Sequence, residues 1–321
     1  MCTAITYQTN DHYFGRNLDV EYAYGEKLII APRMFHFNFS TADNSKYAMI
    51  GIGSVMEDYP LFFDATNECG LSMAGLYFPG NGAYPQKVDN ANNVAPYDFI
   101  PWILSQCATV KEARKKLQNI NLANIAFRED IQPSPLHWIL ADKHESIVME
   151  PVNNELKIYD NPIGVLTNNP PFDFHLYNLA NYINLTREEP RNRFSQNIQL
   201  TPFSRGMGAI GLPGDLSSPS RFIKAAFTKF NSVCDNTESS SIGQFFHILD
   251  SVAQQRGCVR INGEFEKTAY ASCCNTDKCI YYYKTYENSQ ITAVHLFHED
   301  LDTTELKIYE LVTTQQIRFE N

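Results

Sequence analysis

The first nineteen residues constrain this chain more than any other stretch, because a cysteine directly follows the start methionine. Methionine is commonly trimmed before a small residue, so Cys2 could become the first residue and carry both a thiol and a free α-amine. An α-amine has a pKa of about 8 and a thiol a pKa of about 8.5, so proton transfer between the two costs little free energy. A terminal amine can serve as the base for its own side chain. By itself, Cys2 equally fits a small buried cysteine near the start of an edge strand.

The residues behind Cys2 predict a β-hairpin. Residues 3–8 alternate around β-branched side chains, a polar turn follows at 9–11, and an extended pattern resumes at residue 12. The return strand would bring Arg16 and Asp19 close to Cys2, where the arginine would favour a thiolate and the aspartate could orient an ammonium group. An arginine and an aspartate three residues apart are also an ordinary surface pair.

Several further motifs identify a resemblance. The chain reads Asn-Glu-Cys-Gly-Leu at 67–71, Ala-Gly-Leu at 74–76, Gly-Val-Leu-Thr-Asn-Asn-Pro at 164–170, and Leu-Pro-Gly-Asp at 212–215 running into Ser-Arg-Phe at 220–222. Together with the first nineteen residues, these resemble the choloylglycine hydrolase family. These are N-terminal-nucleophile enzymes that include conjugated bile salt hydrolases and penicillin V acylases. The resemblance spans essentially the whole chain.

The resemblance implies a cysteine amidohydrolase. Cys2 would attack an amide carbonyl, form a thioester and expel the amine, after which water would hydrolyse the thioester. The tetrahedral intermediates carry an oxyanion, which needs hydrogen-bond donors placed where the charge develops. In the family these donors are a side-chain amide at the position of Asn168 and a backbone N–H at the position of Tyr77. Taken alone, Asn168 would fit a turn asparagine near a proline.

Three charged residues also match active-site positions of the family. The resemblance implies that Asp19 orients the α-amine of Cys2, that Arg16 tunes the thiolate, and that Arg221 is a second active-site arginine. Without the resemblance, Arg221 would fit an arginine at the start of a helix, paired with Asp215 or with solvent.

The substrate is the least constrained prediction. Tyr77 stands where bile salt hydrolases usually have asparagine and penicillin V acylases usually have tyrosine. The rest of the chain resembles hydrolases of gut lactic-acid bacteria that act on conjugated bile salts. We therefore expect cleavage of glycine- or taurine-conjugated bile acids, with penicillin V acylase as the alternative. A non-catalytic binder of amphipathic acyl ligands, with an inert Cys2, is the alternative from another class.

The acyl group of either substrate requires an apolar pocket. The resemblance suggests that five apolar side chains line this pocket, although each could equally belong to the ordinary core. They are Leu18, Met56, Phe63, Ile131 and Leu136.

Composition excludes other functions. A formal charge of −10 argues against nucleic acid, and 44% hydrophobic residues suit a globular protein. No apolar run is long enough for a membrane span and no signal peptide is recognisable, so we expect a cytoplasmic protein. The eight cysteines show no CxxC spacing and the eight histidines no HExxH spacing, which predicts neither a metal nor a cofactor.

The order of predicted elements is strands, helices, strands, helices, strands, which favours one α+β domain over residues 1–321, with Met1 removed. The resemblance implies a four-layer αββα sandwich of mostly antiparallel sheets, assembled as a homotetramer. Strands are expected at 27–32, 46–53, 59–64, 70–78, 136–142, 145–151, 154–159, 267–273, 279–286, 290–296 and 305–311. Helices are expected near 96–107, after a capping box at 109–112, at 170–182, after an N-cap at Ser218 with Pro219 first in the helix, and at 241–254.

Overall fold

The alternation at the start of the chain forms a hairpin, as predicted. In the computed structural model, which describes residues 1–39 and 45–321, strands β1 (Cys2–Gln8) and β2 (His12–Val20) pair antiparallel with Cys2 opposite Leu18. All nine residues of β2 are buried. A hairpin that begins at the chain end therefore lies in the interior, where polar side chains need partners.

The hairpin lies in a six-stranded antiparallel sheet with the order β12-β1-β2-β15-β16-β17. An eight-stranded antiparallel sheet has the order β11-β10-β9-β6-β5-β4-β3-β18. The other strands of the first sheet are β12 (Val165–Leu166), β15 (Lys267–Asn275), β16 (Ile280–Thr285) and β17 (Asn288–His295). Those of the second are β3 (Lys27–Ala31), β4 (Met49–Met56), β5 (Tyr59–Asn67), β6 (Ser72–Tyr77), β9 (Leu136–Ala141), β10 (Ser146–Val152), β11 (Glu155–Asp160) and β18 (Lys307–Glu310). Two short pairs, β7 (Asn93–Val94) with β8 (Asn121–Leu122) and β13 (Arg260–Ile261) with β14 (Glu264–Phe265), were not predicted.

Helices form where the sequence predicts them, with small shifts at their ends. They are α1 (Phe99–Leu104), α2 (Val110–Leu117), α3 (Phe172–Asn178), α4 (Ser218–Asn231) and α5 (Glu238–Asp250), with short 3-10 turns η1 (Pro96–Asp98), η2 (Leu179–Tyr182), η3 (Met207–Ala209) and η4 (Leu296–His298). The predicted N-cap at Ser218 is wrong by one residue, since Ser217 occupies the N-cap position of α4, without a capping side-chain hydrogen bond, and Pro219 is the second residue of the helix. Helix α5 begins earlier than predicted because the Thr237 side chain accepts from Ser240 N and caps it.

The capping box before α2 is present in a modified form. The Thr109 hydroxyl accepts from Glu112 N at 3.2 Å, as the motif predicts. The Glu112 carboxylate reaches back to Ala108 N at 2.8 Å, one residue before the position that the motif usually satisfies.

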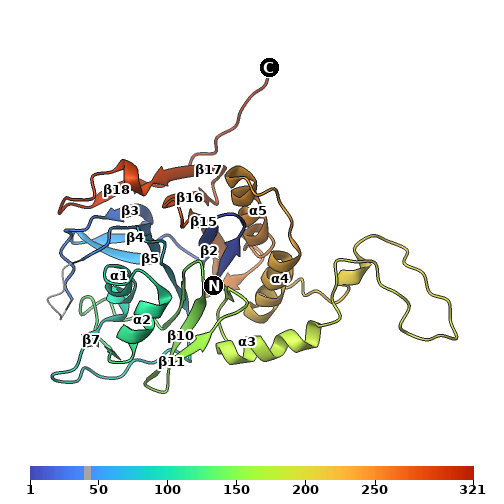
Figure 1. The fold of residues 1–321 in the computed structure, drawn as a ribbon, viewed down its shortest axis with the longest axis horizontal. Helices are drawn as coiled ribbons and strands as arrows, with labels where there is room; N and C mark the ends of the chain where they lie inside the picture. The colour runs from blue at the N-terminus through green and yellow to red at the C-terminus, as the bar shows by residue number, and fades with distance from the viewer. Residues whose placement is uncertain (40–44) are drawn as a thin grey trace.

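The helices and sheets pack as four layers joined by two hydrophobic cores, which confirms the αββα sandwich. One core joins the two sheets and α4 and α5, through residues such as Ile50, Leu76, Phe222 and Phe245. The second lies between the eight-stranded sheet and α1 and α2, around Trp102 and side chains such as Met73. Figure 1 shows α1 and α2 on one side of the paired sheets and α4 and α5 on the other.

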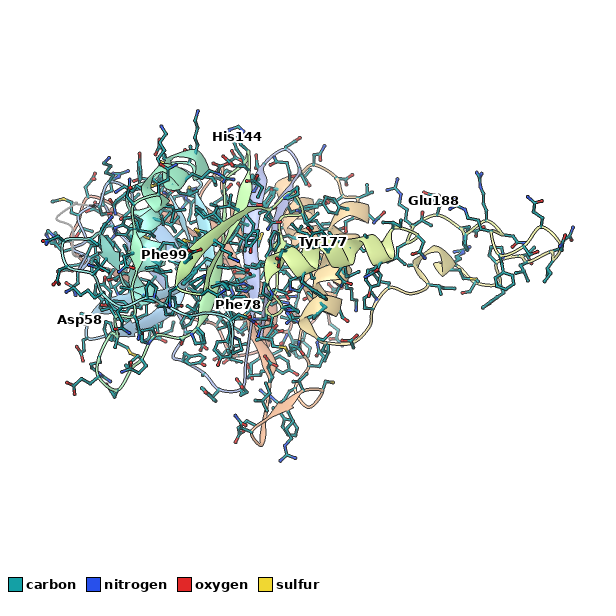
Figure 2. All side chains as sticks on the ribbon, turned by 90° about the horizontal axis from the view of Figure 1, so that it is seen from below. Asp58, Phe78, Phe99, His144, Tyr177 and Glu188 are labelled. Atoms are coloured by element: carbon teal, nitrogen blue, oxygen red, sulfur yellow. The ribbon has the colours of Figure 1, made fainter. Side chains whose placement is uncertain are left out.

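Residues 183–217 connect α3 to α4 as a long arm that projects from the body of the molecule (Figure 1). Figure 2 shows the same projection from another side, with Tyr177 on α3 and Glu188 on the arm. Within the described residues, no helix has the length and apolar character that crossing a bilayer requires. The single-domain organisation remains a prediction.

Candidate active site

Cys2 is buried at the start of β1, with its backbone nitrogen still joined to Met1. Only 4% of the residue is exposed, and its thiol forms no disulfide. The Met1 ammonium group donates to Asp19 O at 2.6 Å and also forms an ion pair with the buried Glu266 carboxylate. In this structure Met1 is in place, so the Cys2 nitrogen is an amide.

The Asn168 side chain connects three segments around Cys2. Its Oδ1 accepts from Cys2 N at 2.8 Å and from Arg221 Nη2 at 2.7 Å. Its Nδ2 donates to the carbonyl of Tyr77 at 2.7 Å. An amide nitrogen carries two hydrogens, and this is the one hydrogen bond that Nδ2 makes within the described residues. The second N–H is therefore available to a ligand beside Cys2.

Arg221 lies in the first turns of α4 and holds the start of β1. Its Nη1 donates to Cys2 O at 2.5 Å and to Thr3 Oγ1 at 2.7 Å, and its Nε donates to Leu216 O at 3.0 Å. Asp19 Oδ2 lies 3.9 Å from the same Nη1. The alternative pairing of Arg221 with Asp215 is not observed among the described residues, because Asp215 accepts hydrogen bonds from Ser217 and Ser220 instead.

Asp19 is buried between cations. Burial raises the pKa of its carboxyl, while Arg221 and the N-terminal ammonium group oppose that rise. Its Oδ1 accepts from Thr268 Oγ1 at 2.6 Å, whereas Oδ2 accepts no hydrogen bond from the described residues. Oδ2 can therefore accept a further hydrogen bond from a donor beside it.

Arg16 is fully buried and is not part of a surface pair. Its Nη1 donates to Gly75 O at 2.5 Å and Phe63 O at 3.0 Å, while Nη2 has no partner among the described residues. Burial disfavours the guanidinium, but the attraction of neighbouring groups that can carry negative charge, Cys2 and Asp64 among them, outweighs it and raises the pKa of Arg16. Asp64 itself accepts from Tyr270 Oη at 2.5 Å.

Sequence reasoning missed Glu266, Thr268 and Asp64. None lies in a recognised motif, and none is near Cys2 in sequence. Thr268 comes opposite Asp19 only because β15 pairs with β2. Burial raises the pKa of Glu266, against the effect of the Met1 ammonium group. The sequence pattern did not point to these residues, because strand pairing and the packing of the two sheets bring them to the site.

The backbone of Asn168 is also held. Its N–H donates to Ser218 Oγ at 2.8 Å, so the first residue of α4 binds the loop after β12 directly. Its carbonyl accepts from His175 Nε2 on α3 at 2.9 Å. Burial lowers the pKa of His175 to about 4, so the ring is neutral near pH 7 and Nε2 is the nitrogen that carries the hydrogen.

The five predicted pocket residues have different surroundings. Leu18 is buried opposite Cys2, and Leu136 pairs with Tyr77 at the end of β6. Phe63 supplies the carbonyl that Arg16 binds, and the ring of Tyr24 lies 6.0 Å from its own. Met56 ends β4, and Ile131 forms an isolated bridge with Arg128. Their role in binding an acyl group remains a prediction.

Comparison with known proteins gives full-length matches. A sequence model described as "Linear amide C-N hydrolases, choloylglycine hydrolase family" matches residues 2–309. The chain is 54% identical over 319 residues, 98% of each chain, to a "Bile salt hydrolase/transferase" of Lactiplantibacillus plantarum. It is 38% identical over 333 residues, all of both chains, to a "Bile salt hydrolase/transferase" of Clostridium perfringens.

Solved structures show the same fold. The C2A mutant of a conjugated bile acid hydrolase from Clostridium perfringens superposes with a TM-score of 0.92, at 38% identity and complete coverage of both chains. A penicillin V acylase from Agrobacterium tumefaciens gives a TM-score of 0.75 at 19% identity, covering 96% of this chain and 91% of that one. The second likeness concerns the fold alone.

We predict that two buried histidines lower the free energy of unfolding of the protein in acid. Burial lowers the pKa of both His175 and His12 to about 4. An unfolded histidine titrates near about 6.5, so the unfolded chain takes up protons first as the pH falls. Each histidine should therefore remove up to about 3 kcal/mol from the free energy of unfolding between about pH 6.5 and about pH 4.

The measurement is urea denaturation of wild type and H175F across this range. The phenylalanine keeps an aromatic ring against Phe222, on which His175 stacks at 4.8 Å, but does not titrate. H175F should lose less stability than wild type as the pH falls, and H12F should do the same independently. Parallel curves for all three proteins would contradict the assignment.

Proposed function

Because the chain belongs to the choloylglycine hydrolase family of linear amide C–N hydrolases, we propose that it cleaves glycine- or taurine-conjugated bile acids. Its full-length likeness to proteins named bile salt hydrolase supports this substrate. The observation that carries the catalytic proposal is the hydrogen bonding of Asn168 to both Cys2 N and the Tyr77 carbonyl. These two hydrogen bonds support the proposal because they hold the Asn168 amide, the donor we propose for the oxyanion, next to Cys2, the nucleophile we propose.

The proposed reaction begins once Met1 has been removed. The Cys2 α-amine then takes the proton of its own thiol, and Asp19 orients the resulting ammonium group. The thiolate attacks the amide carbonyl, forming the C–S bond and an oxyanion. Arg16, whose Nη2 lacks a partner among the described residues, favours the thiolate electrostatically.

The oxyanion is bound by the second N–H of Asn168 and by the backbone N–H of Tyr77. When the intermediate collapses, the C–N bond breaks and the amine leaves with the proton from the α-ammonium group. Water, deprotonated by the α-amine, then attacks the thioester, and the acid and the Cys2 thiol are released. Arg221 keeps Cys2 and Asn168 in register through its hydrogen bonds to both.

We expect C2A to abolish turnover with the fold intact, because no other thiol takes part in the proposed reaction. The measurement is product release by C2A beside wild type, with circular dichroism to check the fold. Protein prepared with Met1 retained, as judged by intact mass, should be equally inactive, since its base is an amide. Turnover by C2A would end the proposal. Wild-type Cys2 that reacts with iodoacetamide no faster than free cysteine would instead favour a non-catalytic binding protein.

The substrate is tested by comparing kcat/KM for glycocholate, taurocholate and penicillin V. We expect a clear preference for the conjugated bile acids. Y77N should change kcat by only a few-fold on the preferred substrate, because the proposed donor is main chain and the Tyr77 side chain is 47% exposed. A preference of wild type for penicillin V, lost in Y77N, would favour the acylase alternative.

We also propose a homotetramer, as the family resemblance implies. The arm between α3 and α4 supports assembly because it exposes large apolar side chains, which commonly mark contact surfaces. These are Ile183, Phe194, Ile198, Leu200, Phe203 and Ile210.

The assembly is tested by sedimentation velocity. Wild type should sediment as a tetramer, whereas F194S/F203S should sediment as smaller species. V233S, which alters an exposed apolar residue outside the arm, is the matched control and should leave the tetramer intact. A monomeric wild type, or a tetrameric F194S/F203S, would contradict the proposal.

A further inference from the structure

A buried pair that the reaction above does not use, His137 and Glu150, lies behind the predicted oxyanion site. His137 is on β9 and Glu150 on the neighbouring strand β10, and neither side chain is exposed. His137 Nδ1 lies 2.9 Å from Glu150 Oε1, and His137 Nε2 lies 2.8 Å from the carbonyl oxygen of Thr167. The ring thus bridges a carboxyl group and the residue before Asn168.

The two acceptors define the role of each nitrogen. A carbonyl oxygen only accepts hydrogen bonds, so Nε2 must carry a hydrogen and donate it to Thr167 O. Nδ1 faces the Glu150 carboxyl group at hydrogen-bond distance. The contact with Glu150 therefore helps to fix the ring orientation in which Nε2 reaches Thr167 O.

The same pair holds the other end of the segment that carries Asn168. Phe172 N, at the start of α3, donates to both oxygens of Glu150, at 3.1 and 3.2 Å. Residues 167–172 are thereby attached at both ends to neighbouring buried side chains. The Asn168 carbonyl within this segment is bound by His175.

His137 also contacts the second half of the oxyanion site. Its ring stacks on Phe78, with centroids 4.3 Å apart and planes 4° from parallel. Phe78 directly follows Tyr77, whose backbone N–H is the proposed second donor. One imidazole therefore touches the two chain segments that supply the proposed donors.

We propose that His137 and Glu150 form a positioning pair for the oxyanion site, with His175 as a second positioning residue for Asn168. This rests on the proposed role of Asn168 and Tyr77 as oxyanion donors. Donors act by being held in place before charge develops, and a misplacement of about 1 Å can cost about 100-fold in rate. The pair does not touch the substrate. Its loss should lower kcat more than it raises KM.

The test uses two variants that differ only at residue 137. In E150Q, the glutamine oxygen can accept from Phe172 N and its NH₂ can donate to a neutral His137, which keeps its hydrogen on Nε2. E150Q should thus retain kcat within about threefold of wild type. In H137F/E150Q the bond to Thr167 is lost without leaving a buried charge, and the ring against Phe78 remains. Its kcat should fall at least about tenfold.

A second readout separates positioning from general damage. Alkylation of Cys2 by iodoacetamide develops no oxyanion, so its rate should be equal in wild type, E150Q and H137F/E150Q. H12F is the matched control for losing a buried histidine elsewhere, since His12 binds Thr276 instead of the site, and it should retain kcat. H175F should behave like H137F/E150Q and provides the test if the double variant does not fold.

Several results would overturn the inference. One is a folded H137F/E150Q, or H175F in its place, with wild-type kcat. Another is alkylation that slows in parallel with turnover, and a third is an E150Q that loses as much activity as the double variant. The amide used is one that wild type hydrolyses. A wrong substrate proposal would therefore show in wild type, whereas a wrong role for the pair would show only in the variants.

Discussion

The oxygen of the Asn168 side chain accepts hydrogen bonds from Cys2 and Arg221, which lie 166 and 53 residues away in the chain. Its nitrogen binds the Tyr77 carbonyl, 91 residues away. Both large sheets and helix α4 therefore meet at one amide group. Because such a group has fixed donor and acceptor directions, it can satisfy all these partners only when the layers pack in one arrangement.

Burial of charge is the second constraint. Arg16, Arg221 and Asp19 are almost wholly shielded from water, where an unpaired charge is costly. The fold compensates by placing cations and anions in one buried cluster and by directing main-chain carbonyls at the guanidinium groups. The same cluster includes Glu266, which binds the Met1 ammonium group. Removal of Met1 would therefore move the chain's ammonium group from Met1 to Cys2 and change the charge balance around Glu266.

The regular elements follow closely from local pattern, and their limits show where tertiary contacts intervene. Alternation predicted the hairpin of β1 and β2 because period-two patterns reflect burial on a sheet face. The short strand β12 was missed, since two residues carry no periodicity. It exists because its backbone pairs with β1 at Ala4 and Ile5. That pairing brings the Thr-Asn-Asn-Pro motif beside Cys2.

The sequence by itself determined the order of the longer strands and helices and the family, and it singled out Cys2, Arg16, Asp19, Asn168 and Arg221 as site candidates, because these lie in motifs or periodic segments. Only the tertiary structure decided which groups support them. Glu266, Thr268 and the His137–Glu150 pair belong to no motif, and their partners lie on other strands and loops. Strand register and layer packing set such contacts, and a local pattern of residue types does not encode them.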